Sequence, residues 1–184
     1  MKLRAFVSVD IHPSSRLSDL LNDLKGCGSG LRVVKHSNLH LTLKFLGNTE
    51  EGQIEDVIRL VESSTTDIQP FEIRLSGMGA FPSLSNVRII WVGVENGKNL
   101  EVLAERLDIS LAALGFKRER RAYRPHLTVA RTRGGGGLSS ARDLIAMNAA
   151  TDYGDCVIDR VTLKKSVLTP EGPIYSDIRE IKLD

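Results

Sequence analysis

Two short stretches of this sequence place a histidine and a threonine at the same spacing. The first, HLTL, begins at His40, and the second, HLTV, begins 86 residues later at His126. In an extended strand successive side chains point to opposite faces, so the histidine and the threonine of each stretch would share one face. The pattern therefore predicts two half-buried strands, each of which presents an imidazole and a hydroxyl.

An imidazole pair suits acid-base chemistry at phosphorus. The unperturbed pKa of a histidine imidazole, about 6.5, lets one ring be neutral while another is protonated. One ring would take a proton from the attacking oxygen, and the other would give one to the departing oxygen. Thr42 and Thr128 would hold the phosphoryl oxygens, and Arg131 would add a guanidinium. We therefore predict His40 and His126 as the catalytic pair, with the sequence leaving open which is the base.

The segments that must position these groups form two copies of one pattern. Each half of the chain reads as strand, helix, strand with His-x-Thr, helix and strand, and an offset of about 86 residues superposes nearly every element. Hydrophobic periodicity predicts helices at residues 14–25, 50–62, 100–114 and 139–148, and strands at 4–11, 31–35, 40–46, 71–75, 87–94, 126–131 and 157–168. Glycine-rich residues 77–82 would be the linker between the halves, and glycines 134–137 a flexible loop.

The duplication predicts the architecture. We expect an α+β fold in which a duplicated β-α-β-α-β unit forms two pseudo-symmetric lobes, with largely antiparallel sheets around a central cleft. The chain would be a single bilobal domain, residues 1–184, with lobe-forming repeats at about 1–80 and 87–170. A pseudo-twofold axis between the repeats would bring His40 and His126 together across the cleft.

Composition excludes several classes of protein. The 184 residues are 41% hydrophobic and 26% charged, which argues against disorder and fibrous repeats, and the net charge of +2 is small for a protein that coats nucleic acid. Cys27 and Cys156 lack metal-ligand spacing, so we predict free thiols in a reducing cytosol and no zinc site. No apolar run suits a signal peptide or a bilayer span. We predict a cytoplasmic monomer without membrane contact.

The motifs resemble the 2H phosphoesterase superfamily, and specifically its RNA 2′,3′-cyclic phosphodiesterase branch, first described as LigT-like 2′-5′ RNA ligases. The resemblance implies that His40 and His126 are the catalytic pair. It also implies that Thr42, Thr128 and Arg131 bind the phosphate, and that no metal or cofactor is needed. The stretches that carry the resemblance are RAFVSVD (residues 4–10), HLTLKFLG (40–47) and PHLTVAR (125–131).

The resemblance implies an enzyme that hydrolyses 2′,3′-cyclic phosphate ends to 2′-phosphates, on RNA ends such as those of tRNA halves or on cyclic nucleotides. The reverse of this reaction, on two RNA ends held together, would join them through a 2′-5′ linkage without ATP. The alternative is a non-catalytic RNA-end or nucleotide-binding module on the same fold, against which the intact motifs argue. A metal-dependent phosphohydrolase is disfavoured, because neither motif has an Asp/Glu cluster at ligand spacing.

A basic run precedes the second motif. Residues 117–121 read KRERR and are followed closely by Tyr123 and Arg124. Such a run is usually a solvated edge. Its position next to the motif also makes Tyr123 and Arg124 candidates for contact with an RNA backbone, and the sequence allows both interpretations.

Overall fold

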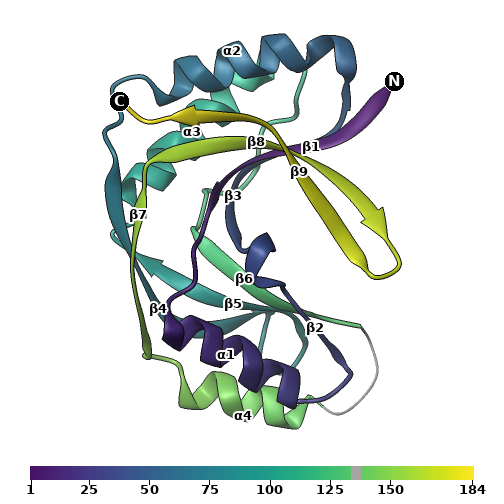
Figure 1. Ribbon diagram of the computed structural model, residues 1–184, viewed down its shortest axis with the longest axis vertical. Coiled ribbons are helices and arrows are strands. Elements are labelled where there is room, and N and C mark those ends of the chain that lie inside the picture. Colours follow the sequence, from purple (N-terminus) through teal and green to yellow (C-terminus); the bar gives the residue numbers. More distant parts are fainter. Residues whose placement is uncertain (134–137) are drawn as a thin grey trace.

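The computed structural model describes residues 1–133 and 138–184 and has two lobes, each a sheet with helices on its outer side (Figure 1). The glycines predicted to form a loop, 134–137, lie outside the described residues. In chain order the elements are β1 (Lys2–Asp10), α1 (Ser15–Gly26), β2 (Leu31–Val33), η1 (His36–Asn38), β3 (His40–Glu50), η2 (Glu51–Gln53), α2 (Ile54–Thr65), β4 (Phe71–Pro82), β5 (Val87–Glu95), α3 (Lys98–Ala112), β6 (His126–Thr132), α4 (Ser139–Met147), β7 (Asp152–Ile158), β8 (Arg160–Thr169) and β9 (Gly172–Lys182), where η1 and η2 are 3₁₀ turns.

Both sheets are antiparallel, which confirms the predicted fold class. One sheet has the strand order β3-β1-β8-β9 and the other β2-β6-β5-β4-β7. Each sheet therefore takes strands from both halves of the chain. The helices are exchanged in the same way, because α1 contacts β2 and β7 whereas α3 contacts β3 (Figure 1). The lobes are thus assembled jointly by the two halves, and the repeat boundaries at 1–80 and 87–170 stay a prediction.

The α1 helix shows how local sequence produces these elements. The hydroxyl oxygen of Ser14 accepts a hydrogen bond from the backbone N–H of Leu17 at 3.2 Å and so caps the first turn. Leu17, Leu20, Leu21 and Leu24 recur at helical spacing and are all buried. Among the described residues, no helix is both long and apolar enough to cross a membrane.

Two predicted strand ends were wrong because glycines bend these strands without ending them. β3 continues past Gly47, at φ +67°, as far as Glu50, so α2 begins later than predicted. β4 likewise continues through residues 77–82, the segment predicted to be a linker, with an irregular register at Gly77, φ +70°. Gly79 has a packing role there, because a Cβ at this position would collide with the Trp91 ring.

The C-terminal strands were also predicted incompletely. The single strand expected at 157–168 is two strands, β7 and β8, which are separated at Asp159 and belong to different sheets. β9 was missed altogether. It is an edge strand with mostly exposed or half-buried side chains, so it lacks the apolar alternation by which a strand is recognised in sequence.

Candidate active site

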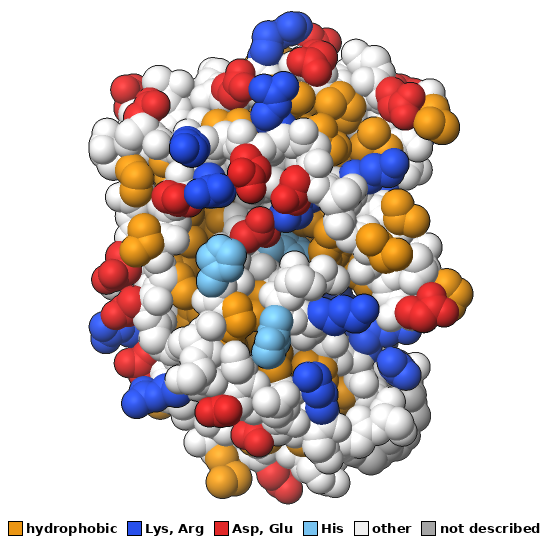
Figure 2. Space-filling model, viewed as in Figure 1, with side chains coloured by type: hydrophobic (Ala, Val, Ile, Leu, Met, Phe, Trp, Pro, Cys, Tyr) orange, Lys and Arg blue, Asp and Glu red, His pale blue; other side chains and the backbone are white. Residues whose placement is uncertain are grey.

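The two His-x-Thr motifs lie on β3 and β6, which contact each other between the lobes (Figure 1). Leu41 and Leu127 point into the cores and are fully buried. The histidine and threonine of each motif are half-buried on the opposite face. Figure 2 shows histidine side chains gathered midway along one face of the molecule, with Lys and Arg side chains beside them.

A bulge on β6 decides where Arg131 lies. The register between β5 and β6 slips at Val129, so Val129 and Ala130 are both buried and the alternation of faces reverses beyond them. Residues five apart in an unbroken strand point to opposite faces. Because of the bulge, the exposed Arg131 instead shares the face of His126 and Thr128.

β3 has the same bulge at the equivalent position. The register between β1 and β3 slips at Leu43, and both Leu43 and Lys44 are buried. Lys44 would lie beside Thr42 in a regular strand. The slip instead turns it towards α3, and it places Phe45 on the face of His40.

The backbone orients both imidazoles in the same way. The Nδ1 atom of His40 lies 2.7 Å from the carbonyl oxygen of Asn38, and that of His126 lies 2.8 Å from the carbonyl oxygen of Arg124. Since a carbonyl oxygen only accepts hydrogen bonds, Nδ1 carries the proton in both rings. Nε2 is then the acceptor of a neutral ring or the second donor of a protonated one, so a neutral and a protonated ring form a base and an acid.

Aromatic rings contact both histidines, and none of these contacts was predicted from the sequence. Tyr175 meets His40 edge-on with ring centroids 5.2 Å apart, and the centroid of the Phe6 ring lies 5.1 Å from those of both His40 and Tyr175. Phe81 meets His126 edge-on at 5.1 Å. These residues belong to β9, β1 and β4, so no local spacing in the sequence could have linked them to the motifs.

The electrostatic surroundings of His40 favour its neutral form. Burial lowers its pKa, the carbonyl of Asn38 and the charge of Asp10 oppose that effect, and Lys164 and Arg131 add to it. Lys164 Nζ lies 3.0 Å from Asp10 Oδ2. Because Arg131 belongs to the other sheet, its influence shows that β6 contributes charge to the surroundings of His40.

Comparison with known proteins identifies the family. The model of the 2′-5′ RNA ligase superfamily matches residues 13–167. This chain belongs to that superfamily. It is 37% identical to an RNA 2′,3′-cyclic phosphodiesterase of Methanothermobacter thermautotrophicus, with 100% of both chains covered. It is 35% identical to one of Methanocaldococcus jannaschii, with 97% of this chain and 99% of the other covered.

Solved structures share the LigT-like fold. TT0787 of Thermus thermophilus has a TM-score of 0.82 at 24% identity, with 98% of both chains covered. E. coli LigT complexed with 3′-AMP has a TM-score of 0.77 at 21% identity, with 100% of this chain and 99% of that chain covered. The fold predicted from the duplicated motifs is therefore confirmed for this member of the superfamily.

The two residues predicted to contact RNA have different surroundings in this superfamily member. Tyr123 packs against the hydrophobic core, and burial raises the pKa of its hydroxyl. Arg124 is exposed, and its carbonyl orients His126. An RNA contact at either residue stays a prediction. Within the described ranges, no group of three or more His, Cys, Asp or Glu side chains is arranged to hold a metal.

Proposed function

We propose that this chain opens 2′,3′-cyclic phosphate ends of RNA to 2′-phosphates by acid-base catalysis between His40 and His126. The observation that supports this most is the matched orientation of the two rings. Each Nδ1 is engaged by a backbone carbonyl, which leaves each Nε2 for proton transfer. Full-length similarity to RNA 2′,3′-cyclic phosphodiesterases supports the substrate class.

The surroundings of His40 suggest how the roles divide. Burial lowers its pKa, so near neutral pH the ring is in the neutral form that accepts a proton from water. The water oxygen bonds to phosphorus while the bond to O3′ breaks, and His126 gives O3′ its proton. Thr42 and Thr128 donate hydrogen bonds to the phosphoryl oxygens, and Arg131 balances their negative charge.

A substrate with sulfur in place of the 3′ oxygen tests this division, because a thiolate departs without general-acid help. His126→Ala should recover most of its lost rate on the sulfur substrate. His40→Ala should recover little, because water still lacks its base. The opposite pattern would reverse the two roles, and no recovery in either variant would contradict departure assisted by an imidazole.

The same proposal predicts that no divalent metal takes part. The two imidazoles transfer the protons and Arg131 balances charge, so hydrolysis of a 2′,3′-cyclic nucleotide should persist after dialysis against excess EDTA. Complete loss of hydrolysis, restored by a divalent ion, would favour the metal-dependent phosphohydrolase.

Ligation is the reverse of the same chemistry. A 5′-hydroxyl would replace water, and a 2′,3′-cyclic end would be joined without ATP, for example between tRNA halves. The competing function, a module that binds RNA ends without turnover, predicts that cyclic ends are recovered unchanged after incubation at enzyme excess. Cytoplasmic location and the monomeric state remain predictions.

A further inference from the structure

A basic pocket of about 570 Å³ lies along β3, beside the residues that follow the first His-x-Thr motif. One wall is Phe45, Leu46 and Gly47 of β3, and the other is the segment 117–121 that leads towards β6. Neither wall contains a residue of the proposed acid-base machinery.

Aromatic rings connect this pocket with His40. The Leu43 bulge turns Phe45 to the face of His40, where this residue is 58% exposed. Phe6 bridges the two, with its centroid 5.1 Å from that of His40 and 6.3 Å from that of Phe45. The Phe45 wall of the pocket and His40 therefore lie on the same face of the sheet.

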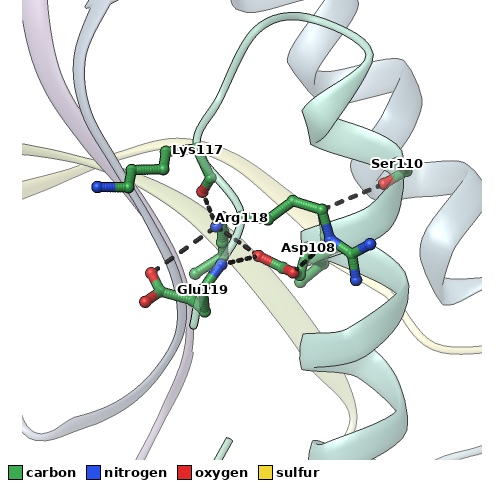
Figure 3. A network of polar contacts seen from close by, with 7 residues as sticks. Asp108, Ser110, Lys117, Arg118 and Glu119 are labelled. Atoms are coloured by element: carbon green, nitrogen blue, oxygen red, sulfur yellow. Dashed lines mark hydrogen bonds and ion pairs between the residues drawn. The ribbon is translucent and has the colours of Figure 1, made fainter. Parts of the chain in front are cut away.

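The second wall is fixed in place by a buried ion pair (Figure 3). Lys44 Nζ, on a side chain only 1% exposed, donates to Asp108 Oδ1 and to the carbonyl oxygen of Lys117, both at 2.6 Å. Asp108 also accepts from the backbone N–H of Glu119 at 2.9 Å and from Arg118 Nε at 3.0 Å. The segment is thus preorganised against β3 and α3.

The charges of this wall are only partly neutralised. Arg118 pairs with Asp108, and Glu119 lies 3.7 Å from Lys44. Lys117, Arg120 and Arg121 are exposed and pair with no acidic residue in the described part of the chain. An exposed aromatic residue that lines one pocket with unpaired cations is the combination that binds single-stranded nucleic acid, by base stacking and phosphate contacts.

We propose that the pocket binds the nucleotide on the 5′ side of the terminal one, in an RNA whose 3′ end carries the cyclic phosphate. The cyclic phosphate occupies the 2′ and 3′ oxygens of the terminal nucleotide, so that nucleotide is joined to the rest of the RNA only through its 5′ oxygen. The rest of the RNA must therefore leave the site in that one direction. The penultimate base stacks on Phe45, and Arg120 and Arg121 bind the phosphate that joins the two nucleotides. The inference rests on the proposed function and makes the enzyme selective for RNA strands over mononucleotides.

The test compares kcat/KM for a trinucleotide with a 2′,3′-cyclic end and for a 2′,3′-cyclic mononucleotide, in the same preparation. The wild type should prefer the trinucleotide. Phe45→Ala should reduce that preference by about 5- to 150-fold, the loss expected for one stacked base. Arg120→Ala with Arg121→Ala should reduce it too and should weaken its salt dependence. Arg59→Ala, an exposed arginine on α2 outside the pocket, is the matched control and should leave the preference unchanged.

The outcomes separate this inference from the proposed function. A wild type inactive on both substrates would contradict the proposed function. In that case, binding of a labelled trinucleotide, weaker for Phe45→Ala than for Arg59→Ala, still supports the pocket. An active wild type with equal selectivity in every variant would overturn the inference, as would loss of activity on both substrates in equal proportion.

Discussion

At the scale of single residues, the two motifs place the same group in different surroundings. One type of backbone hydrogen bond orients both imidazoles, yet His40 packs against the contacting rings of Phe6 and Tyr175 and is influenced by Lys164 and Arg131. Those surroundings lower the pKa of His40 and suit it to accept a proton. Different surroundings for equivalent groups are how a duplicated unit can provide both an acid and a base.

Removing either imidazole should impair chemistry without unfolding the protein. His40→Ala and His126→Ala should each lower kcat/KM for a cyclic nucleotide by about 10²- to 10⁴-fold. The double variant should lose much less than the product of the two, because the rings act as a unit. Leu41→Ala is the control, since the cavity in the core should cost about 2 to 5 kcal/mol of unfolding free energy. Near-normal turnover by a folded histidine variant would contradict the mechanism.

The dependence of kcat/KM on pH should be bell-shaped. Activity falls at low pH when the base is protonated, and burial lowers the pKa of His40, so this limb should lie below the ordinary imidazole value of about 6.5. The midpoint of each limb is a property of the coupled pair, while the base determines that a low-pH limb exists. His40→Ala should abolish the low-pH limb. A rate that climbs steadily through the imidazole range would point to attack by hydroxide.

At the scale of elements, two bulges and one ion pair organise the site. The bulges bring Arg131 to the histidine face of β6 and remove Lys44 from that of β3. Lys44 then fastens β3 to α3 through Asp108. The residue 86 positions after Lys44 is Ala130, so only one of the two equivalent strands carries this anchor.

The ion pair should make the free energy of unfolding depend on pH in the acidic range. Burial would raise the pKa of Asp108, but hydrogen bonds from Lys44, Glu119 and Arg118 outweigh it and lower the pKa to about 2. A depressed carboxyl pKa stabilises the fold above the unfolded value of about 3.9, and this contribution is lost as the pH falls towards 2. In urea unfolding, Asp108→Asn should therefore lose less stability than the wild type between pH 5 and pH 2. An equal loss in both proteins would contradict the lowered pKa of Asp108.

Breaking the pair at neutral pH should be costly. Lys44→Ala leaves the carboxylate of Asp108, 12% exposed, without its buried cation, for which about 3 to 5 kcal/mol is expected. The double variant Lys44→Met with Asp108→Leu removes both charges and should recover much of that loss. Urea unfolding at pH 7 measures both, and a Lys44→Ala variant as stable as the wild type would show that the pair contributes nothing.

At the scale of the whole molecule, the exchange of strands and helices makes the two lobes interdependent. β8 and β9 complete the sheet begun by β1 and β3, and β4 joins the sheet of β5 and β6. The β8–β9 hairpin also reaches the other sheet, because Arg32 of β2 donates a hydrogen bond to the carbonyl oxygen of Pro170 at 2.9 Å. Neither half has a complete sheet of its own.

Dividing the chain in the exposed turn at residues 83–86 tests this dependence. Fragments 1–84 and 85–184 should each lack a cooperative thermal transition, because each would expose the strand edges that the other covers. Mixing them should restore a transition and cyclic-phosphate hydrolysis. A cooperative transition in either fragment alone would mean that the lobes fold independently.

The sequence by itself determined the repeated motifs, their superfamily and most helices and strands. The reason is that periodicity and repetition are carried by residues close together in the chain or at one constant offset. Simple alternation was enough to predict which side chains share a face, in β3 up to Thr42 and in β6 up to Thr128.

Only the tertiary structure decided which face Arg131 and Lys44 occupy, because a bulge is defined by how a strand pairs with its neighbour. It also decided that β4 continues past Gly77 and Gly79, since the need for glycine at position 79 comes from the ring of Trp91 packed against it. The rings of Phe6, Tyr175 and Phe81 reach the histidines through sheet pairing and lobe exchange. Those contacts join residues far apart in the chain, and no local pattern records them.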